Sequence, residues 1–531
     1  MKANKLLYGL AMAPALAGAQ STPEKPNIIF VLCDDMGWGD LGCYGQQYIS
    51  TPNIDRMAAE GMQFMQAYAG CPVSAPSRAS LMTGQHTGHT KIRGNKEYWQ
   101  GKLQPNMYGE NADYTLVGQE PLDPKHKVIP EIMKENGYTT AQFGKWAGGY
   151  EGSESTPDKR KVDVFYGPLC QFQAHAYYPN FLNRYDSSIG DTEVTREVLT
   201  ENIQHAFSTD DYFNRPQYSA DLIHQRALQW IDDVADGDKP FYGLFTYTLP
   251  HAELAQPEDS ILLGYRDKFC NDTNWSGKGG NDNADWYHVA LGRHAQFAAM
   301  ITRLDAYMGE IMAKLEEKGI ADNTILIFSS DNGPHEEGGA DPDFFNRDGV
   351  LQGKKRSCLE GGIRVPFIVR WPGNVPAGVK SDHQLAFYDV MPTFCELIGV
   401  KDTDYRNPEL GENDYFDGIS FLPTLLGKDK DQKKHEYLYW EIWESGKQEL
   451  AVRQGDWKFI LRGDIKKSTN EVTIKTALYD LATDIHEDHN LAADPRYTDK
   501  LNELKTIARN ARVESSVEQF HFNQAVKDAL Q

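Results

Sequence analysis

Long apolar runs alternate with stretches of helical periodicity over the first 370 residues of the chain. Five runs rich in β-branched and aromatic residues predict strands at 27–33, 138–146, 240–248, 324–330 and 365–371. Apolar residues at steps of three and four predict an amphipathic helix over 297–315, stopped by Gly319. Strands that alternate with helices predict an α/β fold, in which a large, mostly parallel sheet is sandwiched by helices.

The pattern changes after about residue 430. Short strand-like runs cover 437–443, 451–461 and 476–481, and a helical stretch follows at 499–512. The run at 451–461 contains a Gly-Asp turn. This part predicts a small antiparallel sheet with one helix. We therefore expect two domains, a large one at 26–430 and a small C-terminal one at 431–531, although the length of 531 residues alone favours about three.

Polar residues stand where two of the predicted strands end. Asp34 and Asp35 follow the first strand, and Asp331 and Asn332 follow the strand at 324–330. Ligands of a parallel sheet bind at the carboxyl ends of its strands. Two adjacent carboxylates repel each other without a cation, and four oxygen donors suit Ca²⁺ or Mg²⁺ better than Zn²⁺. Either pair taken alone is also compatible with an ordinary solvated turn.

Two long segments, 151–215 and 252–286, are polar and rich in Gly, Asn, Asp and Tyr. Loops of this length are usually functional or disordered. Because they follow predicted strands, we expect them to border a ligand site.

The first 19 residues are typical of a cleavable secretory signal. Lys2 and Lys5 precede an apolar run at 6–16, and small residues at 17–19 provide a cleavage site. The run is too short to cross a bilayer, and no other segment is long and apolar enough to do so. We therefore expect a secreted or periplasmic protein without a membrane span.

The charge and the cysteines exclude several classes of protein. With 54 basic against 76 acidic residues the net charge is −22, which argues against a nucleic-acid partner and against an anionic membrane surface. A small anionic substrate remains compatible, because the charge inside a pocket can oppose the global sign. The seven cysteines form no CxxC pair, which argues against a zinc knuckle. Because their number is odd, at least one thiol is free. The sequence leaves open whether the others form one or two disulfides.

The segment at 71–84, CPVSAPSRASLMTG, carries the most specific motif of the chain. Ser74, Pro76 and Arg78 fit the pattern Cys or Ser, x, Pro, x, Arg, and an LxTG sequence follows. Cys71 does not fit, because no Pro or Arg stands at the required distance from it. With this motif the chain resembles the type I sulfatases of the alkaline phosphatase superfamily, and the resemblance extends over nearly the whole chain.

The resemblance implies a modified residue and a metal. Ser74 would be oxidised to Cα-formylglycine (3-oxoalanine) by a sulfatase-maturating enzyme, which is then a partner of the chain. One hydroxyl of the hydrated aldehyde attacks sulfur, and the other then expels sulfate, a route that an unmodified Ser lacks. Similarity to the family favours one Ca²⁺ ion over Mg²⁺, with ligands from Asp34, Asp35, Asp331, Asn332 and residue 74.

Four cationic or basic side chains match family positions. Arg78 would brace residue 74, and Lys145 matches the lysine of a GKW sequence. His251 follows the strand at 240–248. Lys355 is preferred over its neighbour Lys354 because of its five-residue spacing to the EGG sequence. Their implied roles are to stabilise the sulfuryl oxygens and to protonate the leaving alcohol, the latter by His251 with help from Lys355.

One position departs from the family. Many relatives read GKWH, whereas this chain has Ala147 after the tryptophan. That His contacts formylglycine in relatives, so its role is vacant here or is filled from elsewhere. His86 and His89 are candidate substitutes.

Two stretches, 86–95 and 171–182, resemble bacterial carbohydrate sulfatases. They mix aromatic and polar residues, which suits a sugar. The resemblance implies release of a 6-O-sulfate, with 4-O next, from galactose or N-acetylgalactosamine of glycosaminoglycan or mucin. Arg93 and His175 are candidate sugar contacts. A positive pocket in an acidic surface favours exo action on short sulfated oligosaccharides.

Two other functions fit parts of the pattern. A phosphomonoester or phosphodiester hydrolase of the same superfamily would use Ser74 directly, but such enzymes bind two metals and the sequence offers no evident second His-rich cluster. A non-catalytic binder of sulfated glycans would keep the pocket, but the intact set of Ser74, Arg78 and the acidic residues argues for an enzyme.

Overall fold

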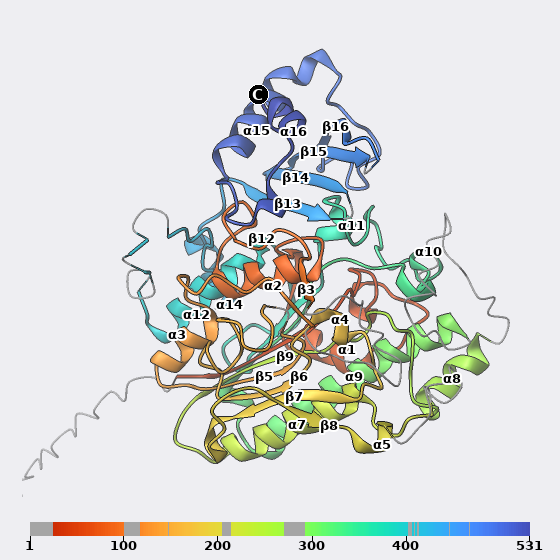
Figure 1. The fold of residues 1–531 in the computed structure, drawn as a ribbon, viewed down its shortest axis with the longest axis vertical. Helices are drawn as coiled ribbons and strands as arrows, with labels where there is room; N and C mark the ends of the chain where they lie inside the picture. Colours follow the sequence, from red (N-terminus) through yellow and green to blue (C-terminus); the bar gives the residue numbers. More distant parts are fainter. Residues whose placement is uncertain are drawn as a thin grey trace, which may run out of the picture.

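The computed structural model describes residues 25–99, 117–146, 148–203, 214–269, 292–401, 406–407, 409–410, 414–444, 446–466 and 468–531. The predicted signal at 1–19, Cys270 and Ala147 lie outside these residues, as does part of the segment at 252–286. Figure 1 shows a large lower part built around one sheet and a small sheet, in blue, on top of it.

The large sheet has ten strands in the order β12-β2-β11-β10-β1-β9-β5-β6-β7-β8. Their bounds are β1 Asn27–Cys33, β2 Met62–Tyr68, β5 Thr139–Gly144, β6 Val164–Gly167, β7 Phe181–Asp186, β8 Thr195–Val198, β9 Phe241–Thr246, β10 Thr324–Ser330, β11 Phe367–Arg370 and β12 Val379–Ala386. A two-stranded sheet joins β3 Glu97–Trp99 to β4 Val117–Gln119.

Five neighbouring strands at the centre, β10, β1, β9, β5 and β6, run parallel. Every residue of β1, β9 and β10 is buried, so these strands need apolar side chains on both faces and read as continuous apolar runs in the sequence. The predicted fold class, a mostly parallel sheet sandwiched by helices, is therefore confirmed.

The outer strands differ from the prediction. The run at 365–371 forms β11, which pairs antiparallel with β10 and β2. The segment at 151–215 contains three strands, with β6, β7 and β8 paired in sequence. Most of β8 is exposed at the sheet edge, so its polar sequence TREV carries no apolar signal. The interpretation of this segment as a loop was wrong for that reason.

Helices cover both faces of the sheet. On one face α1 (Pro52–Ala59), α7 (Ser219–Ala235) and α9 (Arg293–Glu317) pack in one apolar cluster with Ile29 and Val31. On the other face α2 (Ser74–Thr83), α3 (Ile129–Glu135) and α12 (Val390–Ile398) pack with Ile28 and Phe30. The predicted helix at 297–315 lies within α9. The alternation along β1 thus divides the core into two layers.

Shorter helices and turns link these elements. Their bounds are α4 Gln171–Ala174, α5 Thr200–Ile203, α8 Ser260–Lys268, α10 Pro342–Phe345, α11 Glu360–Ile363 and α14 Leu422–Leu425.

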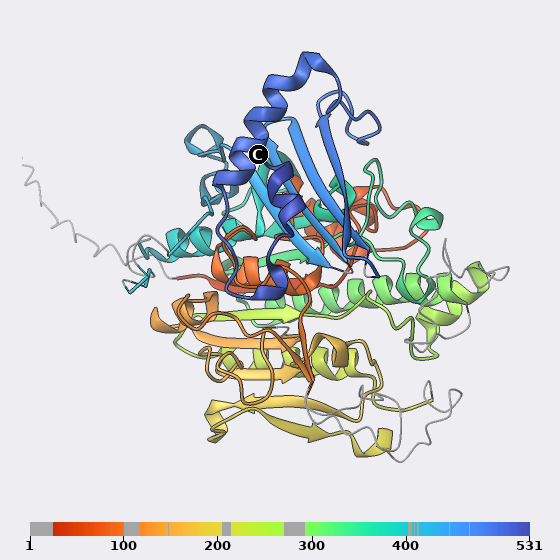
Figure 2. The same ribbon diagram turned by 45° about the horizontal axis from the view of Figure 1, so that its top comes forward.

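The C-terminal sheet has four antiparallel strands, β13 Leu438–Glu444, β14 Lys447–Gln454, β15 Trp457–Lys466 and β16 Glu471–Asp480. Its outer face packs against α15 (Thr498–Asn510) and α16 (Gln524–Ala529). Leu438, Trp440 and Ile442 on the inner face pack against residues of the large part. Figure 2 shows this sheet lying across the large part. The run at 451–461 is two strands, and α16 is a helix that the sequence did not predict.

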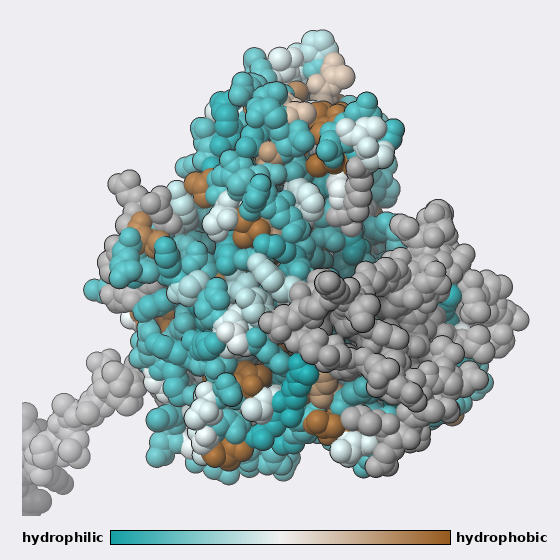
Figure 3. Space-filling model, viewed as in Figure 1, coloured by the Kyte–Doolittle hydropathy of each residue, from teal (hydrophilic) through white to brown (hydrophobic). Residues whose placement is uncertain are grey.

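On the face shown in Figure 3, the described surface is mostly hydrophilic, with small scattered apolar areas. Within the described ranges, no helix is both long and apolar enough to cross a bilayer. The six described cysteines, Cys33, Cys43, Cys71, Cys170, Cys358 and Cys395, are free thiols, and all but Cys43 are buried. None of these six forms the disulfide that the sequence left open.

Candidate active site

Four adjacent parallel strands deliver polar side chains to one edge of the large sheet. Asp34 and Asp35 follow β1, Asp331 and Asn332 follow β10, Lys145 follows β5, and His251 lies five residues after β9. Cys33 pairs with Ser330 in register, so the residues after them emerge side by side. The strand-end cluster, defined here as Asp34, Asp35, Asp331 and Asn332, is fully buried, with 0% exposure of each residue.

Ser74 is the first residue of α2 and faces the strand-end cluster. Its hydroxyl donates to Oδ1 of Asp34 at 2.7 Å and lies 3.4 Å from Oδ1 of Asn332. Residue 74 therefore sits at the N-terminus of a buried helix, where partial positive charge favours an anionic group. The motif and the strand ends, which are far apart in the sequence, meet at this one side chain.

Two cations neutralise one carboxylate of the cluster. Lys145 Nζ donates to Oδ2 of Asp34, and Arg78 Nη2 lies 3.7 Å from the same oxygen. Burial alone would raise the pKa of Asp34, but Lys145, His251 and Arg78 together hold it well below its ordinary value. Arg78 also donates to Oδ2 of Asp331, from Nε at 2.9 Å.

Asp331 behaves in the opposite way. Burial, and next the charge of Asp34, raise its pKa to about 7 in spite of the contact with Arg78. Three carboxylates thus lie close together in a buried site, an arrangement that suits a bound cation.

His251 and Lys355 form the other side of the cluster. Lys355 Nζ lies 2.8 Å from Oδ2 of Asp35, 2.8 Å from Oε2 of Glu337 and 2.9 Å from Nε2 of His251. Burial, and next the charge of Lys355, lower the pKa of His251 well below its ordinary value. Burial opposes the charge of Lys355, but Asp35 and Glu337 raise its pKa. The structure thus pairs a neutral imidazole with a charged ammonium.

Lys354, the alternative that the spacing argument set aside, lies elsewhere. Its side chain is 44% exposed and pairs with Glu336, which is not part of the cluster.

A cavity of about 260 Å³ opens beside Ser74. Sequence reasoning predicted four of its lining residues, Ser74, His175, His251 and Lys355, and missed six others, Asn95, Glu97, Gln171, Glu337, Arg356 and Glu444. Arg356 stands next to Lys355, and Asn95 and Gln171 lie in the two stretches that suggested a sugar. Glu444 belongs to the C-terminal sheet, and nothing in its local sequence marks it.

The two candidate sugar contacts have different positions. His175 lines the cavity, and its ring stacks on that of His251 with 4.1 Å between centroids. Arg93 is fully buried and pairs with Glu441 at 2.9 Å, away from the cavity lining. An arginine held between Glu441 and backbone carbonyls braces the loop instead of meeting a sugar, so the structure corrects that expectation.

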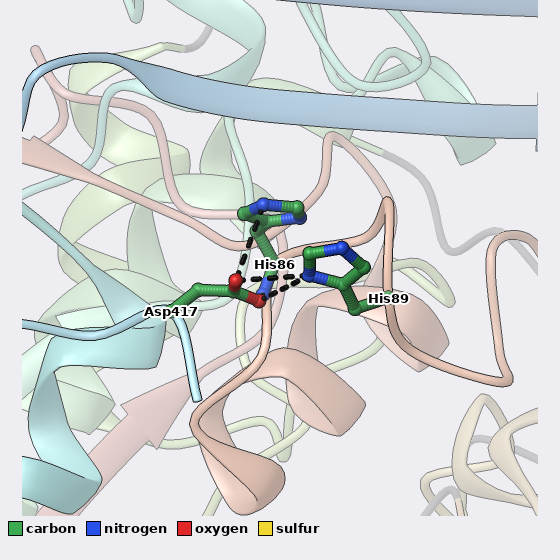
Figure 4. A group of neighbouring side chains, drawn as sticks. All are labelled: His86, His89 and Asp417. Carbon is green, nitrogen blue, oxygen red and sulfur yellow. Dashed lines mark hydrogen bonds and ion pairs between the residues drawn. The ribbon is translucent and has the colours of Figure 1, made fainter. Parts of the chain in front are cut away.

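The candidate substitutes for the family His form a separate group with Asp417, shown in Figure 4. His89 Nδ1 lies 2.9 Å from Oδ1 of Asp417, and His86 Nε2 lies 3.4 Å from the same oxygen. The N–H of Gly88 donates to Nδ1 of His86, which leaves the proton on Nε2, toward the carboxylate. Neither His lines the cavity, so the structure does not bring them to Ser74.

The strand-end cluster fits a hard cation. Its donors are carboxylate and amide oxygens, which is the ligand chemistry of Ca²⁺ and Mg²⁺. Ligand atoms of Asp34, Asp35 and His251 lie within 4.8 Å of one another. A cation held here would polarise an anionic group bound in the cavity.

Fold and site together fit a hydrolase for an anionic ester group, because a serine and several cationic side chains meet beside a cavity and next to oxygen donors suited to a hard cation. The sulfatase family model matches residues 26–400, and the chain belongs to that family. A second model, described as N-sulphoglucosamine sulphohydrolase, C-terminal, matches residues 353–514. The chain is therefore a sulfuric ester hydrolase.

Similar proteins cover most of the chain. An N-acetylgalactosamine-6-O-sulfatase of Bacteroides thetaiotaomicron is 29% identical over 91% of this chain and 92% of its own. The N-acetylgalactosamine-6-sulfatase of the dog, Canis lupus familiaris, is 32% identical over 79% of this chain and 69% of its own. The crystal structure of Ps i-CgsB with k-i-k-neocarrahexaose superposes with a TM-score of 0.66, at 25% identity over 96% and 97% of the two chains.

Proposed function

We propose that this enzyme removes a sulfate ester from a carbohydrate, with a formylglycine made from Ser74 and one Ca²⁺ ion. The observation that carries the proposal is the contact of Ser74 with Asp34 at the meeting point of four strand ends, beside a cavity. Galactose or N-acetylgalactosamine 6-sulfate is the first-choice substrate, with the 4-sulfates next.

The names of the relatives support the choice of sugar. Both curated relatives described above are named for the 6-sulfate of N-acetylgalactosamine. The structural relative was solved in complex with k-i-k-neocarrahexaose. The cavity beside Ser74 also combines histidine rings with side-chain oxygens, as a sugar site requires.

The metal and the modified residue would supply the chemistry that ordinary side chains lack. Asp34, Asp35, Asp331, Asn332 and residue 74 would hold Ca²⁺, which neutralises charge on the sulfate. Hydrated formylglycine at residue 74 would supply the attacking hydroxyl and the means to expel sulfate. The N-terminus of α2 and Arg78 keep residue 74 facing the cluster.

The remaining residues bind the sulfate and move one proton. Lys145 and Lys355 lie on either side of the aspartates, where their charges would stabilise negative charge on the sulfuryl oxygens. His251 and Lys355 share one hydrogen bond at the cavity. We assign to this pair the donation of a proton to the leaving alcohol.

The cellular setting follows from the same proposal. A cleavable signal at 1–19 would export the chain to the periplasm or beyond, after or during oxidation of Ser74 by a maturating enzyme. We keep the domain division at residue 430 and exo action on short sulfated oligosaccharides as part of the proposal.

Mass spectrometry tests the modified residue directly. In protein made together with a maturating enzyme, the peptide that contains residue 74 should be lighter than the unmodified peptide by two hydrogen atoms. The Ser74→Ala variant, made in the same way, is the control. An unmodified Ser74 in a preparation that hydrolyses phosphate esters would instead establish the phosphohydrolase alternative.

The metal is tested by its removal. Dialysis against EDTA should abolish sulfate release and lower the melting temperature, and Ca²⁺ should restore both. A ligand at 100 times its Kd stabilises the folded state by about 2.7 kcal/mol, which a thermal scan detects. Full activity after chelation would contradict the metal assignment.

A further inference from the structure

The cavity beside Ser74 contains two groups of side chains with opposite chemistry. Lys355 and Arg356 supply hydrogen-bond donors and positive charge near residue 74, and His251 contacts Lys355. Asn95, Glu97, Gln171 and Glu444 also line the cavity. We call these four residues the acceptor group, because each carries a side-chain oxygen and two of them are carboxylates. Sulfate binding explains the presence of the cationic side chains but not that of the acceptor group.

The acceptor group is assembled from distant parts of the chain. Glu97 begins β3, Gln171 begins α4, and Glu444 ends β13 in the C-terminal sheet. The backbone N–H of Asn95 donates to Oε2 of Glu444 at 3.2 Å, and Arg356 Nε lies 3.7 Å from Oε1. Glu444 is thus held in place from both sides, and the small domain contributes to the site.

The two carboxyl groups influence each other. Burial, and next the charge of Glu444, raise the pKa of Glu97 to about 7. Glu444 already disfavours the charged form of Glu97. An anionic group of a ligand bound beside these two residues would add a further repulsion.

Two oxygens of the group have no donor among the described residues. Oδ1 of Asn95 and Oε1 of Gln171 are buried and have no hydrogen-bond partner among the described residues, and Gln171 is only 4% exposed. A buried acceptor without a partner is costly, so a ligand that brings donors to this side of the cavity is favoured.

A sugar offers two kinds of group to such a surface. Hydroxyls and the N–H of an acetamido group donate hydrogen bonds, whereas a sulfate ester and a uronate carboxylate only accept them and carry negative charge. The acceptor group therefore matches neutral donors and opposes anions.

We propose that Glu97 and Glu444, supported by Gln171 and Asn95, make this sulfatase selective for a sugar that carries one sulfate. They would bind the hydroxyl or amide groups near the ester and reject a second sulfate or a carboxylate on the same sugar. This inference rests on the proposed function and names the substrate class of the same cavity.

Selectivity is measured with two pairs of sugars. The first pair is N-acetylgalactosamine 6-sulfate and its 4,6-disulfate, and the second is the corresponding galactose pair. Sulfate release by the mature, Ca²⁺-loaded enzyme is followed by ion chromatography. For the pair that is hydrolysed, we expect kcat/KM of the wild type to favour the monosulfate by about 100-fold, because like charges in a buried site oppose binding strongly.

The variants Glu444→Gln and Glu97→Gln test the assignment. Each keeps the shape and one acceptor oxygen but removes the charge, so kcat/KM for the monosulfate should fall by about tenfold. The preference for the monosulfate should fall by about tenfold as well. Glu436→Gln, an exposed carboxylate just before β13, is the matched control and should leave both values unchanged.

The outcomes separate the inference from the proposed function. Release of sulfate with an unchanged preference in both folded variants, or a wild type without any preference, would overturn the selectivity proposal alone. If the mature wild type releases sulfate from none of the four sugars, the proposed substrate is overturned as well. If one variant has a lowered melting temperature, the selectivity of the other variant decides whether the proposal holds.

Discussion

Two buried charge clusters of this enzyme look alike by charge and burial but differ in position. The strand-end cluster lies at the carboxyl ends of β1 and β10 and contacts Ser74, His251 and Lys355, which line a cavity. The other, which we call the junction cluster, consists of Glu360, Arg453, Lys458 and Glu487 and joins α11 to the C-terminal sheet. Lys458 Nζ lies 2.9 Å from Glu360 and 3.0 Å from Glu487.

Perturbed pKa values do not distinguish the two clusters. Burial, and next the charge of Asp34, raise the pKa of Asp331 to about 7, and burial raises that of Glu487 to about 7 as well. Ser74, His251 and Lys355 line the cavity and contact Asp34 or Asp35, whereas no member of the junction cluster lines it. Strand-end position and access to a cavity, instead of an unusual pKa alone, mark the functional cluster. The strand-end cluster should control turnover, and the junction cluster should control stability.

The largest effect is expected at the strand ends. Ser74→Ala removes the proposed nucleophile and should lower kcat by about 10⁴-fold or more. The lost hydrogen bond to Asp34 costs only about 1 kcal/mol, so the melting temperature should change little. Ser80→Ala, on the same helix and outside the cavity lining, is the control and should keep full activity. A Ser74→Ala enzyme with a tenth of wild-type activity would refute the role of residue 74.

Lys458→Met should act mainly on stability. The lysine is fully buried between two carboxylates, and removing one partner of such a group costs about 3–5 kcal/mol. Urea unfolding should show the shift, while kcat and KM at 20 °C stay near wild type. Lys475→Met, at an exposed pair with Asp464, is the control and should change stability little. A large loss of kcat without a loss of stability would break the distinction between the clusters.

A smaller effect should appear as a dependence on pH. Because burial raises the pKa of Glu487 from 4.5 to about 7, the folded state keeps a proton that the unfolded chain has lost. The stabilisation is present below pH 4.5 and is lost as the pH rises through 7. Relative to Glu487→Gln, the wild type should lose about 2 kcal/mol of unfolding free energy between pH 5 and 8. A constant difference between the two proteins across this range would show that Glu487 titrates normally.

The sequence predicted the centre of the fold better than its edges. Strands β1, β9 and β10 are buried on both faces and therefore contain continuous apolar runs. Strand β8 lies exposed at the edge, and its sequence is polar. Strands β14 and β15 meet at Gly455 and Asp456, where the sequence predicted a Gly-Asp turn.

The same distinction applies to the site. Ser74, Asp34 and Asp331 stand in local motifs or directly after apolar strands, so their proximity follows from the parallel sheet. Glu97 and Glu444 reach the cavity only because β3 and β13 fold against the large part, and no local pattern reports that packing. Arg93 was misjudged because its motif does not reveal its buried partner, Glu441.

The smallest expected effect concerns two adjacent lysines, which the sequence separated only by their spacing to the EGG sequence. Lys354 is 44% exposed and pairs with Glu336, whereas the side chain of Lys355 is 4% exposed and contacts Asp35. Lys354→Met should therefore change the unfolding free energy by less than about 0.5 kcal/mol and kcat/KM by less than about threefold. Lys355→Met should lower kcat/KM by about 100-fold or more, because it removes a cation from the site of developing charge. Steady-state kinetics on both variants decide the matter, and a greater loss with Lys354→Met would mean that the spacing argument selected the wrong residue.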